Sequence, residues 1–579
     1  MFHFVHSYLP HTDFWQGLER RGFIDENSGV KMMQILGTPY EDSFNRLAAP
    51  GGELCRILSE GNRVFWVDRF QGGTHIYPYT YDRKLIDYYD RLLGERFLGF
   101  QMHEWVSNML FDFHKIIGDM YTYKDIESSK RLAERADRSV GGIIDAVMKL
   151  YPDPNGEVYI EAMTPEEWSR SEWPTGTEPM LRKLTELFRD RQSRVDGHLL
   201  ATDSCLTATR LELENGLRAT MPEIGAQNPF ARIQLAIARG AHRAHGIPFG
   251  AYQEPWGGEP FSCCYFKRDK QNEWGIIESE NGVYAPAGEN GGSSMSLLRR
   301  IYFFAFLAGA QFLSEEWGAC NTFYDWQDFE ITPYGKIKKD FIDFARAYPE
   351  LGEPYTPFAL VLPSDLKIVN FNRINSGFNF FRFVEEFPLI EDQRREQHIY
   401  DVLRRIYDRI DVCERTYECS TLTNSPFGDL FDVVYEDDPG ILDRYDYLID
   451  LTGKPDFAAK NASAAARILP SGDIEKLAAR LSELSAELTG ITVEGGPMWM
   501  MNVNGDVRTL SFFNNEGILR SVAEGERVLE GCECSVTVAL PENCARVKPI
   551  FGAARIERDG QLLRFTLEPG DILIIQLAE

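Results

Sequence analysis

Short runs of hydrophobic residues alternate along the first part of the chain with longer segments whose hydrophobic residues recur at helical spacing. The runs lie at residues 2–8, 29–36, 62–68, 96–103, 198–204, 217–223, 247–253 and 309–315. Between them, residues 81–93 and 228–245 show helical spacing, and the second segment opens with Asn and Pro, a favourable helix start. This order predicts βα units, and eight strands is the number that closes a parallel barrel.

The fourth and fifth runs are separated by a much longer connection, residues 105–196, with helical patterns at 125–150 and 178–195. In a βα barrel, the connection that follows a strand starts at the carboxyl-end face, where active sites form. We therefore expect this excursion to roof a pocket.

The pattern changes after residue 355. Strand-like runs at 358–363 and 445–453 surround a helical segment at 393–410, which predicts a small α/β, Rossmann-like domain over 356–470. A charged helix at 471–490 leads into alternating, turn-rich segments, which predict a C-terminal antiparallel β-sandwich domain within 471–579. The predicted fold class is α/β: a (β/α)8 TIM barrel over 1–355, followed by a small α/β domain and a C-terminal antiparallel β domain.

Charge and hydropathy exclude several kinds of partner. The formal net charge of −27, from 61 basic and 88 acidic residues, argues against nucleic acid or an anionic membrane, since both require clustered Lys and Arg. The most hydrophobic long stretch, residues 301–313, is too short to span a bilayer, so no membrane segment is predicted. The N-terminus lacks the features of a secretory signal, which predicts a cytoplasmic protein.

The 10 cysteines are scattered along the chain, and we expect them to be reduced thiols. Cys532 and Cys534 form a C-x-C pair without a second half at zinc-ligand spacing, so we interpret them as strand residues. Neither a metal nor a cofactor is predicted.

Acidic residues stand at or just after the ends of most predicted strands: Asp68, Glu104, Asp203, Glu223, Glu254, Glu315 and Glu316. Aromatic residues lie within two positions of them: Trp66, Trp105, Tyr252, Trp256 and Trp317. Because all strands of a parallel barrel end at the same mouth, we expect these side chains to converge. Acids and flat amphipathic rings together suit a sugar, and glycoside cleavage needs two carboxyl groups that flank one bond.

Two stretches carry a family resemblance. LIDYYDRLLGERFLGFQMHEW, residues 85–105, resembles the strand-four region of the family 42 β-galactosidases and their clan A glycosidase relatives, where the acid/base glutamate follows an apolar strand. IPFGAYQEPWGG, residues 247–258, with SMSLLRRIYFFAFLAGAQFLSEEWG downstream, is similar to the strand-seven region that carries the nucleophile and to the helix and strand eight beyond it. In outline, the likeness covers most of the chain.

The resemblance implies a retaining glycosidase on a carbohydrate substrate, with Glu104 as acid/base and Glu254 as nucleophile. We expect the other residues near the strand ends to bind the sugar: Asp68, Arg69, His103, Trp105, Asp203, Glu223, Tyr252, Trp256, Glu315, Glu316 and Trp317. His103 departs from the family pattern, because the clan usually has Asn there, which bonds the sugar 2-hydroxyl. The middle domain of family 42 enzymes helps to form trimers, so the resemblance allows a homo-oligomer.

The residues leave alternatives open. Glu223 and Glu315 compete with Glu254 for the role of nucleophile, and any single carboxylate or ring could be structural. The acids could also hold a divalent ion, as in a metal-dependent sugar isomerase or epimerase. The remaining alternative is a carbohydrate-binding protein without chemistry.

Overall fold

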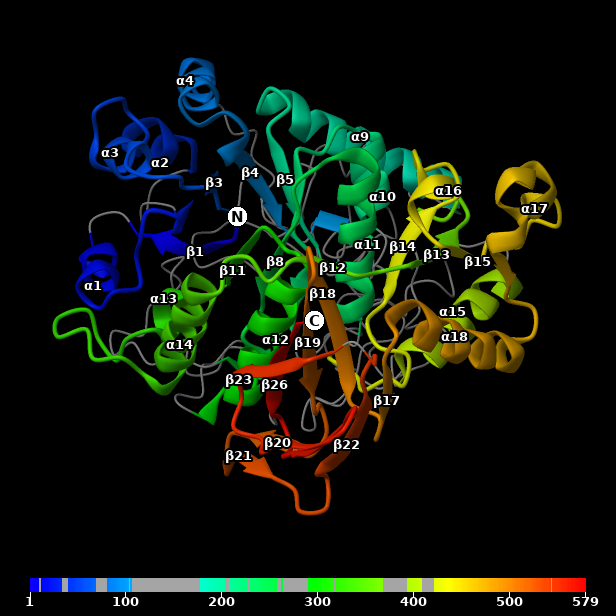
Figure 1. Ribbon diagram of the computed structural model, residues 1–579. Helices are drawn as coiled ribbons and strands as arrows, with labels where there is room; N and C mark the ends of the chain where they lie inside the picture. The colour runs from blue at the N-terminus through cyan, green and yellow to red at the C-terminus, as the bar shows by residue number, and fades with distance from the viewer. Residues whose placement is uncertain are drawn as a thin grey trace, which may run out of the picture.

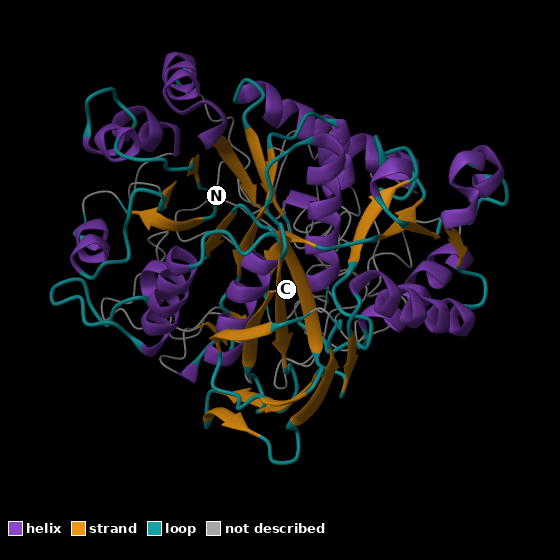
Figure 2. Ribbon diagram, viewed as in Figure 1, coloured by secondary structure: helices purple, strands orange, loops and turns teal. Residues whose placement is uncertain are grey.

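The structure is a computed structural model of the chain. It describes residues 1–9, 12–33, 40–68, 81–103, 105–106, 177–203, 208–225, 230–257, 262–263, 290–316, 318–367, 393–408, 421–542 and 544–578. Three assemblies of strands organise these residues: a large parallel sheet, a small parallel sheet and a set of antiparallel sheets (Figures 1 and 2).

The large parallel sheet closes on itself, and we call the closed sheet the ring. Its strands are β1 (His3–Tyr8), β2 (Gly29–Met32), β3 (Phe65–Val67), β4 (Phe97–His103), β5 (Leu199–Thr202), β6 (Ala219–Thr220), β7 (Glu223–Ile224), β8 (Gly250–Gln253) and β11 (Phe312–Glu315). They pair in the order β6-β5-β4-β3-β2-β1-β11-β8-β7. Only Met221 and Pro222 separate β6 from β7, so the two ends of this order are one interrupted strand that pairs with β5 on one side and with β8 on the other. The result is a TIM-barrel-like α/β fold, and each of the eight predicted runs contains strand residues.

Helices follow the strands around the ring. They are α1 (Phe14–Arg20), α2 (Tyr40–Leu47), α3 (Glu53–Ser59), α4 (Arg83–Leu93), the 3-10 turn η1 (Gly94–Arg96), α9 (Thr177–Arg194), α10 (Ala208–Glu214), α11 (Ala231–His245), α12 (Met295–Leu307), α13 (Gly318–Asn321) and α14 (Pro333–Ala347). The helices predicted at 81–93, 178–195 and 228–245 are confirmed, whereas 125–150 lies outside the described residues.

Side-chain oxygens cap several of these helices. Asp82 accepts a hydrogen bond from the Lys84 backbone at the start of α4, and Ser294 accepts one from Leu297 at the start of α12. The expected cap of α11 was wrong, since Phe230 and not Asn228 occupies its N-cap position.

The two faces of the ring belong to different cores. Residues that point to the inside, such as Val5, Trp66, Leu98, Leu200, Tyr252 and Phe312, form one hydrophobic cluster. Their strand neighbours Phe4, Val67, Phe97, Ala201, Ala251 and Leu313 belong to a larger cluster shared with the surrounding helices. Because successive side chains of a regular strand point to opposite faces, this division indicates the direction of residues near the strand ends wherever the alternation is unbroken.

The small parallel sheet has the order β14-β13-β15-β16. Its strands are β13 (Phe358–Leu362), β14 (Phe431–Tyr435), β15 (Tyr447–Asp450) and β16 (Ile468–Pro470), with α15 (Gln393–Tyr407), α16 (Ile441–Arg444), α17 (Phe457–Lys460), the 3-10 helix η5 (Ala462–Arg467) and α18 (Ile474–Thr489). The runs predicted at 358–363 and 445–453 become the neighbouring strands β13 and β15. The sequence pattern missed β14 and β16.

The remaining strands are antiparallel. One sheet contains β12 (Glu353–Pro354), β18 (Met498–Asn504), β19 (Val507–Phe513), β26 (Ile572–Ala578) and β23 (Arg546–Phe551). Another contains β17 (Thr492–Glu494), β22 (Cys534–Ala539), β25 (Leu562–Leu567) and β24 (Glu557–Asp559), and two ribbons are β20 (Ile518–Ser521) with β21 (Gly525–Val528) and β9 (Trp256–Gly257) with β10 (Ser262–Cys263). Cys534 is a strand residue as expected, whereas Cys532 precedes the strand.

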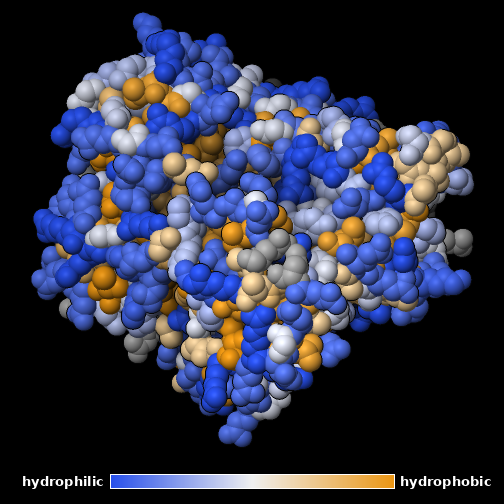
Figure 3. All heavy atoms as spheres, viewed as in Figure 1, coloured by the Kyte–Doolittle hydropathy of each residue, from blue (hydrophilic) through white to orange (hydrophobic). Residues whose placement is uncertain are grey.

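The face of the molecule in Figure 3 is largely hydrophilic, with small scattered hydrophobic groups, in keeping with the net charge of −27. No helix among the described residues combines the length and the hydrophobicity that a membrane crossing requires.

Candidate active site

Strand alternation sorts the predicted site residues into an inner and an outer set. In β11, Phe312 lies in the inner core and Leu313 in the outer one. Two residues further, Glu315 turns outward, where it pairs with Lys338 at 2.5 Å and accepts a hydrogen bond from the Tyr302 hydroxyl. Glu316 turns inward, where its Oε1 lies 4.0 Å from His103 Nε2. The adjacent residues Glu315 and Glu316 therefore lie in different environments.

The inner set lies at the carboxyl ends of the strands, and we call it the mouth cluster: Lys31, Asp68, His103, Glu223, Tyr252, Glu254 and Glu316. Each member has a solvent exposure of at most 4%. Glu254 follows Tyr252 by two residues, and its backbone N–H continues the ladder to Ile224 O at 2.7 Å, so it shares the inward face of β8. The ring thus brings together residues that are far apart in the sequence.

His103 is the centre of the described contacts. Its Nε2 lies 2.9 Å from Glu223 Oε1, and its ring packs edge-on against Tyr252 with centroids 5.4 Å apart. Glu316 is held from the other side, since the Trp256 indole N–H donates to its Oε2 at 2.9 Å. These contacts fix the orientation of one imidazole, two carboxyl groups and an indole at the mouth.

Lys31 is a member that the sequence reasoning missed. It lies in β2, its Nζ donates to Glu315 O at 2.7 Å, and Asp68 Oδ1 is 4.0 Å away. Its ammonium group also lies 5.1 Å from the centre of the Tyr252 ring. A lysine inside an apolar run was the available signal, because a buried ammonium group requires partners.

The mouth cluster holds more negative than positive groups. Among the described residues it has four carboxyl groups, those of Asp68, Glu223, Glu254 and Glu316, against Lys31 and the titratable His103. Buried carboxyl groups in excess favour protonation of some of them, or the binding of a cation or of hydroxyl donors. The nearest ligand atoms of His103, Glu223 and Glu316 all lie within 4.8 Å of one another, so these three residues could hold a metal ion.

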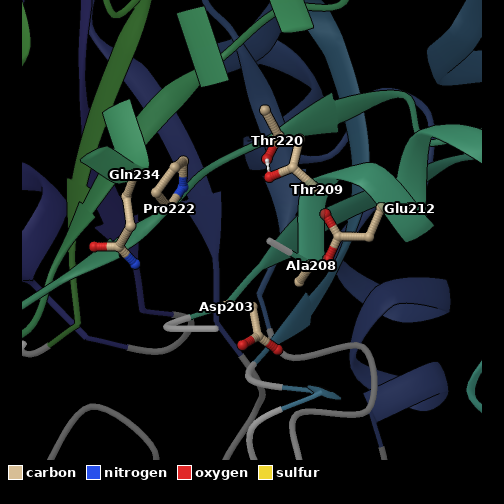
Figure 4. A pocket seen from close by; sticks show the side chains of 7 residues that line it. All are labelled: Asp203, Ala208, Thr209, Glu212, Thr220, Pro222 and Gln234. Atoms are coloured by element: carbon tan, nitrogen blue, oxygen red, sulfur yellow. Dashed lines mark hydrogen bonds between the residues drawn. The ribbon is translucent and has the colours of Figure 1, made fainter. Parts of the chain in front are cut away.

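Three predicted site residues face outward and are not at the mouth: Asp203, Trp105 and Glu315. Asp203 Oδ2 accepts the Val106 backbone N–H at 2.7 Å. The Trp105 indole donates to Glu212 Oε1 at 2.7 Å and packs against Phe188. Figure 4 shows Asp203 and Glu212 around a small pocket with Ala208, Thr209, Thr220, Pro222 and Gln234. Burial, with the nearby charge of Asp203, raises the pKa of Glu212 to about 8.

Some predicted residues cannot be placed. Glu104, Arg69 and Trp317 lie outside the described residues, and so does most of the 105–196 excursion. His103, Trp105 and Val106 are described on either side of position 104.

Comparison with known proteins gives remote likenesses. No family model matches the chain, and no curated protein matches it. Similar solved structures are named as glycosidases, and family 42, which the sequence resembles, is among them. A catalytic mutant of a family 42 β-galactosidase from G. stearothermophilus has 9% identity and a TM-score of 0.48, with 100% of this chain and 98% of that one covered.

Two further likenesses have similar values. The α-L-fucosidase isoenzyme 2 of Paenibacillus thiaminolyticus has 9% identity and a TM-score of 0.44, with 100% and 99% coverage. The β-galactosidase of Halorubrum lacusprofundi has 10% identity and a TM-score of 0.42, with 99% coverage of both chains. At this distance the likeness assigns neither a family nor an activity, so the function is argued from the mouth cluster.

Proposed function

We propose that the chain is a glycoside hydrolase that removes a terminal sugar from an oligosaccharide or glycoconjugate by a two-carboxylate, retaining mechanism, β-galactosidase-like as the sequence resemblance implies. The observation that carries the proposal is the set of four buried carboxyl groups, those of Asp68, Glu223, Glu254 and Glu316, at the carboxyl ends of the strands. Active sites of this fold form at that face. Buried carboxyl groups there suit a reaction that uses one of them as nucleophile.

In the proposed reaction, a Glu254 oxygen attacks the anomeric carbon while the glycosidic oxygen leaves with the bonding electrons and takes a proton from Glu104. A covalent glycosyl–enzyme results. Water then gives a proton to Glu104, and its oxygen displaces Glu254 with a second inversion, so the sugar leaves with its original configuration.

Other mouth residues supply binding. Neither carboxylate oxygen of Asp68 accepts a hydrogen bond from any described residue, which suits an acceptor for a sugar hydroxyl. Trp256 offers an indole ring whose orientation Glu316 fixes, and such a ring packs against the C–H face of a sugar. His103, held by Glu223, occupies the position before the proposed acid/base and is the group we expect to contact the 2-hydroxyl.

The nucleophile is tested by chemical rescue. A screen of aryl glycosides with several sugars and both anomers identifies the substrate first. Glu254→Gly should then lose hydrolysis and regain turnover with added azide, giving a glycosyl azide of inverted configuration. Glu315→Gly is the matched control, because its carboxyl group faces outward. Rescue only at Glu223 would reassign the nucleophile, and near-normal activity of Glu254→Gly would refute the proposal for Glu254.

The acid/base is tested by leaving-group dependence. General acid assistance is typically worth roughly 10²–10⁴ in rate, and an activated leaving group needs less of it. Glu104→Ala should therefore slow natural glycosides far more than nitrophenyl glycosides. An equal loss on both substrates would remove Glu104 from this role.

We further propose that the enzyme acts at chain ends, as the sequence prediction of a pocket roofed by residues 105–196 implies; most of those residues lie outside the described part of the chain. Such a long connection exceeds what a crossover helix requires. Digestion of an oligosaccharide should release monosaccharide from the start. Early release of internal oligosaccharides with little monosaccharide would argue against exo action.

The three-residue ligand set of His103, Glu223 and Glu316 favours a second candidate, a metal-dependent sugar isomerase or epimerase. In that case activity would disappear on dialysis against a chelator and return with Mg²⁺, Mn²⁺ or Zn²⁺. Glycoside hydrolysis that survives the chelator would favour the two-carboxylate hydrolase.

A further inference from the structure

Two buried carboxyl groups outside the proposed mechanism hold the chain where it leaves β4. Asp203, directly after β5, accepts the Val106 backbone N–H at 2.7 Å. Glu212, in α10, accepts the Trp105 indole N–H at 2.7 Å. Both bonds reach the chain from the outer side of the ring, and both involve residues within two positions of the proposed acid/base.

All four participants are deeply buried. The solvent exposure of Asp203 is 6%, that of Glu212 and Trp105 is 2%, and that of Val106 is 0%. Removal of a buried carboxyl group that accepts a hydrogen bond leaves the donor N–H without an acceptor. This costs free energy, because the buried N–H cannot bond to water instead. These contacts therefore constrain one backbone group and one side chain in a solvent-free environment.

The regular alternation of β4 ends at His103. Two residues apart in a strand share a face, yet His103 faces the inner cluster and Trp105 the outer one, and residues 105–106 are helical. The inner anchor of this strand end is Glu223, which contacts His103. The outer anchors are Asp203 and Glu212.

This arrangement persists at neutral pH, because the pKa of Glu212 is raised to about 8 by burial and by Asp203. Glu212 therefore retains its proton at pH 7, and the two neighbouring carboxyl groups avoid carrying two full negative charges. The Oε1 atom remains an acceptor for the indole in that state.

We propose that Asp203 and Glu212 are positioning residues for the end of β4: by holding Val106 and Trp105 they fix the chain directly after Glu104, the proposed acid/base. This inference rests on the proposed function, in which Glu104 donates the proton to the leaving group. A displacement of a reacting group by about 1 Å can cost roughly 10²-fold in rate, so anchors that do not touch the substrate matter.

The test compares variants that keep an acceptor with variants that remove it. Asp203→Asn and Glu212→Gln keep a carbonyl oxygen for the same N–H, whereas Asp203→Leu and Glu212→Met have similar size without one. On a natural glycoside, Asp203→Leu and Glu212→Met should lower kcat by roughly 10–100-fold with KM nearly unchanged. On a nitrophenyl glycoside these two variants should lower kcat less than threefold. Asp203→Asn and Glu212→Gln should keep kcat within threefold of the wild type on both substrates.

A merely structural role would act differently, since partial unfolding removes active molecules and slows both substrates equally. An equal loss of kcat on both substrates, or an equal loss of kcat in Glu212→Gln and Glu212→Met, would overturn the inference. The proposed hydrolase function would still stand. If the wild type hydrolyses no glycoside, the proposed function fails and this inference fails with it. Trp105→Phe is the second variant if Glu212→Met does not fold, because it removes the donor and leaves both carboxyl groups in place; its loss should show the same preference for the natural substrate.

Discussion

Two buried ionic clusters of this protein have opposite charge balance. The mouth cluster places the four carboxyl groups of its described members around Lys31 and His103. The second, which we call the interface cluster, consists of Arg232, Arg239 and Arg243 of α11 with Asp429 and Asp432 of the β14 region. Arg239 Nε lies 2.6 Å from Asp432 Oδ1, and Arg232 Nε lies 3.3 Å from Asp429 Oδ1.

The geometry of the interface cluster explains why it is structural. Each aspartate is contacted by two arginines, and Asp432 also accepts the Tyr445 hydroxyl at 2.8 Å. Burial alone would raise the pKa of Asp432, but Arg239 and Arg243 outweigh burial and hold that pKa below its ordinary value. The buried arginines and aspartates of the interface cluster compensate one another's charge and hydrogen-bonding needs. The mouth cluster instead needs protons, a cation or a substrate to balance its charge. The difference separates a group that joins two parts of the fold from a group that we propose binds and cleaves the substrate.

The largest effect is expected at the mouth. Glu254→Gln should lower kcat on the best aryl glycoside on the order of 10³–10⁶-fold, as loss of a covalent nucleophile does in other enzymes. Its midpoint of urea unfolding should stay equal or rise, because a buried carboxylate among like charges is neutralised. If Glu254→Gln lost activity and also lowered the midpoint of urea unfolding, Glu254 would act as a structural residue, like those of the interface cluster. The contrast between the two clusters would then fail.

A substitution in the interface cluster should lower the free energy of unfolding rather than the activity. Asp432→Asn removes the negative charge between Arg239 and Arg243 and should cost roughly 3–5 kcal/mol in the free energy of unfolding, measured with urea, because buried arginines lose their counter-ion. The activity per folded molecule should be unchanged. An aspartate with a lowered pKa stabilises the folded state above its ordinary pKa of 3.8 and loses that effect as the pH falls through the lower, folded-state value, so wild type and variant should converge in acid. A constant difference at all pH values would contradict the ion-pair explanation.

Glu212→Gln is expected to stabilise the protein in a pH-dependent way. With an ordinary pKa of 4.5 and a folded-state pKa of about 8, the unfolded chain releases the proton first, so wild-type stability falls as the pH rises from 4.5 towards 8. Glutamine does not titrate, so its advantage should grow by roughly 2–3 kcal/mol between pH 5 and pH 7. Urea unfolding at both pH values measures this; an advantage independent of pH would show that Glu212 does not retain its proton.

The smallest effect is expected at an exposed pair, which serves as the reference for both clusters. Lys336 and Asp340 lie 2.8 Å apart on the surface of α14, with side-chain exposures of 71% and 54%. Asp340→Asn should change the free energy of unfolding by less than roughly 0.5 kcal/mol, because solvent screens such a pair. A loss as large as that of Asp432→Asn would mean that burial is not what distinguishes the interface cluster.

The sequence alone determined the architecture of the ring. Repeated apolar runs separated by helical patterns predicted eight strands, and all eight contain strand residues, because each βα unit is specified by local periodicity. The concentration of acids near the strand ends was equally readable: Asp68, Glu223, Glu254 and Glu316 are buried there, and Glu223 and Glu316 both approach His103. The sequence also predicted two neighbouring strands of the small sheet, β13 and β15.

Only the tertiary structure decided which of these acids reach the mouth. Asp203, Glu315 and Trp105 were expected there, yet each points to the outer layer, while Lys31 in β2 points inward. The physical reason is that a parallel barrel buries both faces of its strands, so the hydrophobic pattern is nearly continuous and carries no sign of which residue faces inside. A shift of one residue exchanges the two faces, and closure of the ring together with partners such as Lys338, Glu212 and His103, distant in sequence, fixes that choice.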